Sequence, residues 1–219
     1  MKQNLILATI LLLIFNSAHA DLNQTLREAA EKGDIQTVTT MLKQGAQIDG
    51  KSSYGTTPLM AAAYAGRTDV VKLLVAKGAS VNAVDNTGES ALMTAASKGR
   101  HDVVVYLIAQ GADVHQKNNK SQDALALAAG KAPRKNRPRI IQLLVDKGCD
   151  PNTKDKNNHT PLMDAAYNGD INTVRYLVEK GADVNTKDIT GQTAKNYAEI
   201  FGFADQAEIV KYLKGKESK

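Results

Sequence analysis

The chain has 219 residues and a formal net charge of +5 at pH 7, and 42% of its residues are hydrophobic, with few aromatic residues among them. A net charge this small on a chain of this size gives no indication of a polyanionic partner. The single cysteine, Cys149, excludes an intramolecular disulfide, so the fold has to depend on a packed core of Leu, Val, Ile and Ala side chains.

Residues 1–20 have the layout of a cleaved secretory signal peptide. Lys2 supplies a positive charge, an apolar run follows from Leu5 to Phe15, and small residues precede a cleavage point after Ala20. At about eleven residues, the run is shorter than the ~20 that a membrane-spanning helix needs. We therefore expect export to a bacterial periplasm, or alternatively secretion. An uncleaved N-terminal anchor is the competing interpretation of the same residues.

Two glycine series with a nearly constant spacing dominate the rest of the sequence. One recurs mostly every 33 residues, and its members are Gly45, Gly78, Gly111, Gly148 and Gly181, with the longer step before Gly148. The other keeps the 33-residue step throughout, at Gly33, Gly66 and Gly99. A fixed period of this length is typical of repeat proteins, in which each unit buries its apolar face against its neighbours.

Within one period, the residues predict two helices and a turn. Thr57 can cap the N-terminus of a first helix that begins at Pro58 and ends at Gly66. A second helix follows through 70–76, and Gly78 supplies the left-handed residue that stops it. An extended segment with a turn then leads to the next pair of helices.

The motifs TPL at 57–59, an alanine-rich first helix, VVKLL at 70–74 and GADVN at 181–185 together resemble the ankyrin-repeat family. The resemblance covers the chain after residue 20 and implies an all-α repeat solenoid of about six helix-turn-helix units with hairpin loops. The implied domain spans 21–216, is followed by a tail at 217–219, and divides into repeats at 22–51, 52–84, 85–117, 118–154, 155–187 and 188–216.

The segment 131–139 of the fourth repeat, here called the basic loop, departs from the pattern by an insertion between the two helices. Its prolines rule out one continuous helix, and its positive residues are Lys131, Arg134, Lys135, Arg137 and Arg139. We expect one basic patch at the turn between the helices, bordering the concave side and suited to an acidic protein surface or a phosphate-rich headgroup. A solvated surface loop is the alternative. Nucleic acid is not an expected partner, because no aromatic residues alternate with the charges.

Two further departures predict structure rather than chemistry. Methionines at equivalent positions, Met60, Met93 and Met163, are expected to fill the core between first helices, and the uptake of oxidant is the alternative. In the sixth repeat, Phe201 and Phe203 lengthen the turn and are expected to cover the end of the core, as a terminal repeat requires. Docking of a partner on these two side chains is the alternative.

The sequence contains no constellation that indicates catalysis. The histidines after residue 20, which are His101, His115 and His159, have no metal-ligand spacing to one another or to Cys149. We expect Cys149 to be a small buried apolar residue, with a reactive thiol as the alternative. Aspartates recur at one hairpin position, as Asp85, Asp155 and Asp188, where they help to form a turn. We therefore expect no enzyme activity, no catalytic residues, no cofactor and no metal.

The resemblance implies that a partner protein docks on the concave face, which hairpin tips and the exposed side of the first helices form. The implied contact residues are Tyr54, Thr56, Tyr64, Thr87, Glu89, Ser97, Lys98, Lys120, Gln122, Lys131, His159, Tyr167, Asn168, Thr190 and Gln192, to which the basic loop adds Arg134, Lys135 and Arg137. The tyrosines are the main candidates, because Tyr is enriched in binding hot spots. Packing of Tyr64 and Tyr167 against the next repeat is the alternative.

The same resemblance suggests several roles for a binder outside the cytoplasm. Exported ankyrin-repeat proteins include partners of a periplasmic catalase in peroxide defence and immunity proteins that inhibit secreted toxins, so inhibition or protection of an exported enzyme is the expected role. An effector acting on a host protein is an alternative. Association of the basic loop with an anionic membrane surface is another, and it predicts binding that salt abolishes. The free chain is expected to be a monomer.

Overall fold

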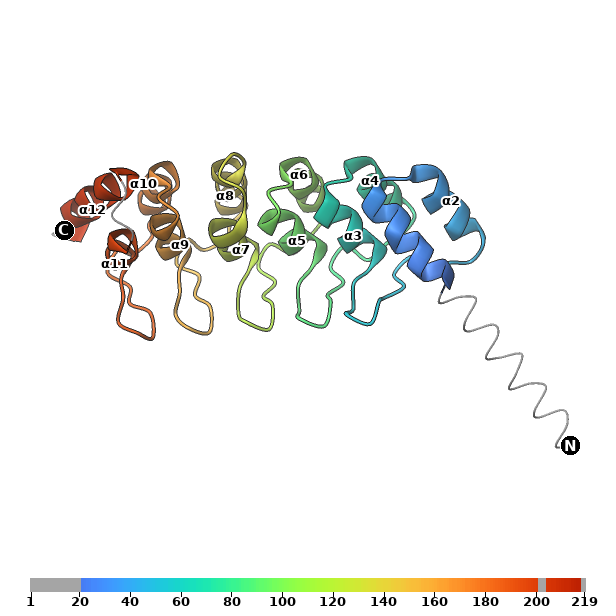
Figure 1. Ribbon diagram of the computed structural model, residues 1–219, viewed down its shortest axis with the longest axis horizontal. Coiled ribbons are helices and arrows are strands. Elements are labelled where there is room, and N and C mark those ends of the chain that lie inside the picture. Colours follow the sequence, from blue (N-terminus) through green and yellow to red (C-terminus); the bar gives the residue numbers. More distant parts are fainter. Residues whose placement is uncertain (1–20, 201–203, 218–219) are drawn as a thin grey trace, which may run out of the picture.

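The computed structural model describes residues 21–200 and 204–217. Over this part of the chain, pairs of helices follow one another in a single row, and hairpin loops project from one edge of the row (Figure 1). The predicted all-α repeat solenoid is confirmed. The predicted signal peptide at 1–20 and the residues Phe201 and Phe203 lie outside the described residues.

Each repeat contributes a first helix and a second helix. The first helices are 21–32, α3 (Pro58–Ala65), α5 (Ala91–Ser97), α7 (Ala124–Lys131), α9 (Pro161–Tyr167) and α11 (Ala194–Glu199). The second helices are α2 (Ile35–Lys43), α4 (Thr68–Ala76), α6 (His101–Ala109), α8 (Arg137–Asp146), α10 (Ile171–Glu179) and α12 (Ala204–Glu217). From α3 to α11, neighbouring first helices pack against one another as well as against their own second helices. None of the helices in 21–200 and 204–217 is long and apolar enough to cross a membrane.

Polar side chains start the first helices as the sequence predicts. Thr57 Oγ1 accepts a hydrogen bond from the backbone N–H of Met60 at 3.3 Å, and Pro58 occupies the first helical position, where a missing N–H costs nothing. The same kind of cap recurs at Ser90, Asp123, Thr160 and Thr193. The local sequence therefore determines where each of these helices begins.

Gly66 shows what the second glycine series does. It ends α3 in a left-handed conformation with a φ of 75°, which glycine adopts without steric cost. A Cβ atom at this position would lie only 2.8 Å from Cδ of Arg100 in the next repeat, and Gly33 leaves room for Arg67 in the same way. The glycine thus ends a helix and also lets an arginine of the following repeat lie across the turn.

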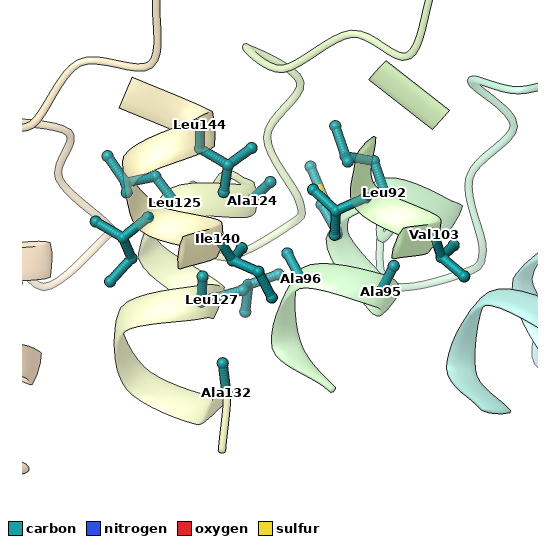
Figure 2. Close-up of a cluster of buried hydrophobic side chains, with 14 of the residues drawn as sticks. Leu92, Ala95, Ala96, Val103, Ala124, Leu125, Leu127, Ala132, Ile140 and Leu144 are labelled. Carbon is teal, nitrogen blue, oxygen red and sulfur yellow. The ribbon is translucent and has the colours of Figure 1, made fainter. Parts of the chain in front are cut away.

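The core runs through the stack as one cluster of buried aliphatic side chains. Figure 2 shows the part to which α5 contributes Leu92, Ala95 and Ala96 and to which the fourth repeat contributes Leu127 and Ile140. All five side chains are at most 1% exposed. Because alanine has only a methyl group, neighbouring first helices can approach closely and leave little space between them.

The methionine and cysteine predictions are confirmed. Met60, Met93 and Met163 are buried and belong to the core cluster. Cys149 is also buried, and its Sγ lies 3.4 Å from the carbonyl oxygen of Val114. Burial, assisted by the charges of two nearby aspartates, raises the pKa of the Cys149 thiol to about 12. The thiol is therefore protonated and shielded, as expected of a structural residue.

Hydrogen bonds within and between hairpins form the edge of the concave face. Asp85 Oδ1 accepts from backbone N–H groups two and four residues on, at 2.8 and 2.9 Å, and Asp155 and Asp188 make the equivalent pairs. The predicted turn role is confirmed. Neighbouring hairpins are joined by backbone bonds such as that from Asn119 N–H to the Thr87 carbonyl at 2.8 Å. Equivalent bonds from the second to the sixth repeat make a ladder of the hairpin tips.

We expect Leu144→Ala to lower the free energy of unfolding by about 2–5 kcal/mol, because it leaves a cavity at a fully buried position of α8. The matched control is Val105→Ala on α6, where the side chain is 43% exposed and the expected change is below about 0.5 kcal/mol. Urea denaturation followed by circular dichroism measures both. Equal effects of the two substitutions would contradict a core built from stacked repeats.

Candidate functional site

A cavity of about 420 Å³ opens on the concave face across the first four repeats. Tyr64 from the end of α3, Lys98 just after α5 and Lys131 at the end of α7 contribute to its walls. Glu89 reaches it from a hairpin, and Met60 adds an apolar contribution. Tyr64, Lys98 and Lys131 are separated in the sequence by about one repeat each, and the stacking of the first helices brings them together.

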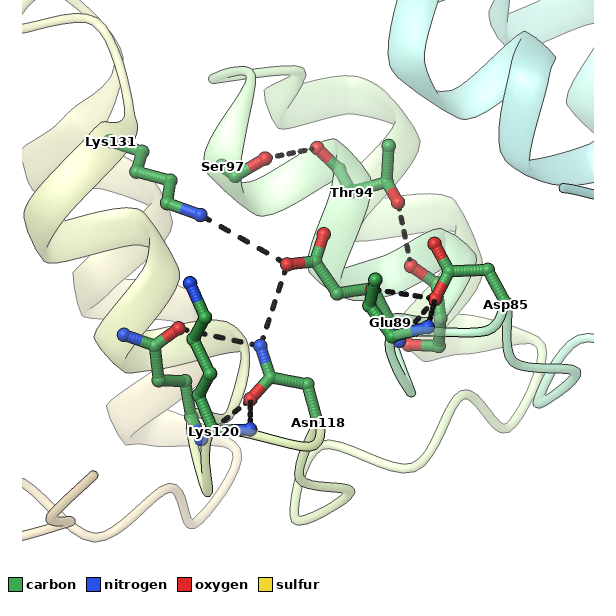
Figure 3. Close-up of polar contacts among 10 residues, drawn as sticks. Asp85, Glu89, Thr94, Ser97, Asn118, Lys120 and Lys131 are labelled. Carbon is green, nitrogen blue, oxygen red and sulfur yellow. Dashed lines mark hydrogen bonds and ion pairs between the residues drawn. The ribbon is translucent and has the colours of Figure 1, made fainter. Parts of the chain in front are cut away.

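The polar side chains around this concave cavity make only long, weak contacts within the protein. Lys98 Nζ lies 4.7 Å from the centre of the Tyr64 ring, a weak cation–π contact at an exposed site. Glu89 Oε1 is 4.0 Å from Lys131 Nζ and 3.4 Å from Asn118 Nδ2 (Figure 3). Such long and solvent-exposed ion pairs contribute little to stability. Both lysines and the tyrosine ring are therefore available for contacts with another molecule.

Ser97 requires a correction. It was expected to contact a partner, but it is only 7% exposed. Its hydroxyl donates to the carbonyl oxygen of Thr94 at 2.9 Å, and the Thr94 hydroxyl in turn donates to the carbonyl of Ser90 (Figure 3). Ser97 thus lies beside the cavity as part of α5, and its hydroxyl is used within the helix.

A second group of concave side chains gathers at the fifth and sixth repeats. The His159 and Tyr197 rings meet edge to face with centroids 4.9 Å apart, and Tyr167 meets Tyr197 at 6.3 Å. His159 Nε2 is 3.2 Å from Asp164 Oδ1, and the Tyr197 hydroxyl donates to Asp188 Oδ2 at 2.6 Å. The group combines aromatic rings with carboxylates, and Tyr167 is its exposed member at 41%.

Sequence reasoning missed Asp164 and Tyr197, although a signal for them exists. Both lie four residues after the cap of a first helix, Thr160 and Thr193 respectively. Thr94 holds the same position after Ser90 and also lines the concave cavity. In the third, fifth and sixth repeats, the side chain one turn into the first helix therefore lies on the concave side, and the repeat alignment contains that rule.

The remaining predicted residues are distributed along the concave face. Exposed side chains lie on or near the hairpins, at Tyr54, Thr87, Lys120, Thr190 and Gln192. Half-buried ones are Thr56, Gln122 and Asn168. Asn168 Nδ2 donates to the Ala129 and Asp164 carbonyls at 3.3 and 2.8 Å, so its amide connects two repeats. In the described part of the chain, no group of three or more His, Cys, Asp or Glu side chains is arranged to hold a metal ion.

The basic loop does not form the single patch that was expected. Lys131 turns to the concave cavity, whereas Lys135 and Arg139 line a separate cavity on the turn edge, the side formed by the turns between first and second helices. Arg134 Nη2 donates to the carbonyl oxygen of Gly169 at 2.7 Å. The proline prediction is confirmed, because α7 ends at Lys131 and α8 begins at Arg137.

The prediction that the Arg137 guanidinium faces a partner is wrong, because this residue is buried, with 6% exposure. Its Nε and Nη2 donate to the Ala132 carbonyl at 3.1 and 2.7 Å, and Nη1 lies 3.7 Å from Asp170 Oδ2. Asp170 also caps α10 in the next repeat. Burial lowers the pKa of Arg137, and the nearby carboxylates of Asp170 and Asp164 oppose this shift. Arg137 is a link between repeats.

We expect Arg137→Met to lower the free energy of unfolding by about 3 kcal/mol, because it leaves the buried Asp170 carboxylate without its cationic neighbour. Lys135→Met in the same loop removes an exposed charge and should change the free energy of unfolding by less than about 0.5 kcal/mol. Urea denaturation of the two variants tests the assignment. If Arg137→Met leaves the free energy of unfolding unchanged, the buried contact contributes nothing to stability.

His159 should make stability depend on pH. Burial disfavours its protonation, but the hydrogen bond to Asp164 and the surrounding carboxylates outweigh burial and raise the pKa of His159. A raised folded-state pKa gives stability that is complete below the unfolded value of 6.5 and is lost as the pH rises through the folded value. The difference in unfolding free energy between the wild type and His159→Gln should therefore be largest at acid pH and shrink on the alkaline side.

Denaturation of wild type and His159→Gln between pH 5 and pH 9 measures this difference. Asp164→Asn serves as the control, because removing the carboxylate should flatten the pH dependence. A difference that grows as the pH rises would reverse the sign and refute the role given to Asp164.

Comparison with known families agrees with this architecture. Two segments, 26–118 and 125–219, match the family model described as ankyrin repeats (3 copies). No curated protein matches the chain. Such repeats indicate a scaffold for protein–protein interaction. Because the two matched segments cover most of its length, the chain belongs to the ankyrin-repeat family.

Proposed function

We propose that the protein is an exported, non-catalytic scaffold that binds a partner protein on its concave face. The concave cavity between Tyr64, Lys98 and Lys131 is the observation that carries the proposal. It combines a half-exposed aromatic ring with lysine side chains that have only weak contacts within the protein. Aromatic side chains at the centre of a surface that excludes water are typical of binding hot spots.

The chemistry of the concave face favours a partner with mixed character. The cavity wall carries both lysines and carboxylates, including Glu31 and Glu89, around the Tyr64 ring. The group at the fifth and sixth repeats adds the exposed Tyr167 ring beside carboxylates. A folded protein that presents an apolar side chain with charges of both signs around it would complement this surface. The ladder of hairpin tips holds the two regions at a fixed spacing.

Export is supported by the layout of residues 1–20, with their positive N-terminus, apolar run and small residues before Ala20. The proposed place of action is therefore the periplasm. The proposed partner is an exported enzyme, which the scaffold inhibits or protects. The two roles differ in a measurable way, because an inhibitor lowers the activity of the captured enzyme and a protector preserves it under stress.

A protein partner is favoured over association of the whole basic loop with an anionic membrane surface. Such association needs several mobile cations on one face. The loop instead divides its charges, because Lys131 lies at the concave cavity and Arg137 is buried. Arg134 is held by a hydrogen bond to the carbonyl of Gly169.

Affinity capture from periplasmic extract of the native cells, followed by mass spectrometry, tests the proposal. The bait is the purified protein, and the variant combines Tyr64→Ala, Lys98→Ala and Tyr167→Ala, all at exposed concave positions. We expect one stoichiometric partner, whose affinity in calorimetry falls more than about tenfold in the variant because hot-spot contacts are lost.

The matched control combines Val105→Ala and Lys77→Ala, which are exposed positions on or directly after second helices. This control should retain the partner, and circular dichroism should show unchanged folding in both variants. If the concave variant binds the captured protein as tightly as the control does, the concave face is not the binding site.

A further inference from the structure

A second cavity, of about 390 Å³, opens on the turn edge and shares no lining residue with the concave cavity. Its walls come from three successive repeats. The second repeat contributes Gly66 and Thr68, the third contributes the start of α6 from Arg100 to Val103, and the fourth contributes Lys135, Asn136 and Arg139. The protein-binding function proposed for the concave face does not use this turn-edge cavity.

The turn-edge cavity is cationic. Arg100, Lys135 and Arg139 line it, and Asp102 is the one carboxylate among the lining residues. The Asp102 side chain is 86% exposed, and its Oδ1 lies 3.2 Å from His101 Nδ1. Its carboxylate is therefore hydrated and already has a partner. Lys135 and Arg139 make no hydrogen bond or ion pair within residues 21–200 and 204–217. Within these described ranges, no carboxylate is paired with either charge.

Arg100 is held in place by one side-chain hydrogen bond, which leaves most of its N–H donors available. Its Nε donates to the Tyr64 carbonyl at the end of α3, at 3.0 Å. The aliphatic part of the side chain lies against Gly66, which has no Cβ to displace it. A guanidinium carries five N–H donors, so the outer nitrogens remain free to bind an anion.

The helices that begin around this cavity lack side-chain caps. Residues Arg67, Arg100 and Asn136 occupy the N-cap positions of α4, α6 and α8, and none of them caps its own helix. Each donates instead to a backbone carbonyl of the preceding repeat. The second helices α2 and α10, by contrast, are capped by Asp34 and Asp170. The first turns of these three helices therefore have no capping side chain as an acceptor, and the positive ends of their dipoles lie at the turn edge.

We propose that the turn-edge cavity binds a phosphate-type oxyanion between the guanidinium of Arg100 and the side chains of Lys135 and Arg139. Three positively charged residues line one cavity, and charge-assisted hydrogen bonds from such groups to phosphate oxygens are among the strongest in proteins. The first turn of α6 also lines the cavity and adds backbone donors. The phosphate belongs either to a small soluble molecule or to a lipid headgroup.

The experiment is a titration of the purified protein with inorganic phosphate, followed by ¹H–¹⁵N NMR at constant ionic strength. A saturable shift of the backbone amides of His101, Asp102 and Val103 is expected, because these lie at the start of α6 in the cavity wall. In the variant Lys135→Gln/Arg139→Gln, the apparent dissociation constant should rise at least about tenfold, since two charge-assisted contacts are lost.

The matched control is Lys77→Gln/Lys147→Gln, which removes the same charge from exposed positions just after α4 and α8, at the far end of these helices. Its affinity should stay within about twofold of the wild type, because these lysines affect the cavity only through screened long-range charge. If both variants lose affinity equally, phosphate is attracted only by diffuse charge and the proposed site is wrong.

Co-sedimentation with phosphatidylcholine vesicles, with and without phosphatidylglycerol, separates the two sources of phosphate. Binding of inorganic phosphate that depends on Lys135 and Arg139, without vesicle binding, assigns a soluble ligand. Vesicle binding that requires phosphatidylglycerol and these two residues assigns a lipid headgroup. If neither inorganic phosphate nor vesicle binding depends on these two residues, the proposal is overturned.

Discussion

The close contact between neighbouring first helices is the constraint from which the rest of the molecule follows. Each first helix presents alanine to its neighbour, as at Ala95 and Ala96 of α5, which are fully buried. Only a methyl group separates the backbones, so the hairpins that precede the helices come close enough to bond directly, as in the 2.8 Å contact from Asn119 N–H to the Thr87 carbonyl. Larger side chains here would spread the repeats and break that ladder. The same spacing aligns Tyr64, Lys98 and Lys131 around one cavity, although they lie in different repeats.

Features that depend on a few adjacent residues could be predicted from the sequence, and features that depend on the next repeat could not. Thr57 caps α3 through a residue three positions away, and Asp85 forms its turn with residues two and four positions away, so both follow from local chemistry. Arg137 and Lys135 have the same charge and share one loop, yet one is buried and the other exposed. The difference depends on Asp170, which lies in the following repeat. The burial of Ser97 likewise depends on packing, and composition carries no sign of it.

The residue before a second helix makes one of two kinds of hydrogen bond to the backbone. At α2 and α10, an aspartate caps its own helix. At α4 and α6, an arginine holds the same position and donates to a carbonyl of the repeat before it. A cap and a hydrogen bond of this kind each contribute about 1 kcal/mol, so the exchange is close to neutral for stability. The arginine differs from the aspartate in that its hydrogen bond connects two repeats. It also leaves the N-terminus of its own helix without a side-chain acceptor.

That exchange makes the two edges of one scaffold chemically different. The concave face has tyrosine rings with charges of both signs, which suits a protein surface, whereas the turn edge concentrates cations and uncapped helix ends. The cavities share no residue, and the buried core lies between the hairpins and the second helices. The hydrogen bond from Arg100 in the turn-edge cavity to the backbone carbonyl of Tyr64 in the concave cavity joins the two, so a ligand on one edge could affect the other through this bond or by shifting whole repeats relative to each other. The hairpin ladder and the arginine bonds both oppose such a shift, because each fixes one repeat against the next. Substitutions at Lys135 or Arg139, which leave the Arg100 hydrogen bond in place, are therefore expected to leave the affinity of the concave face unchanged.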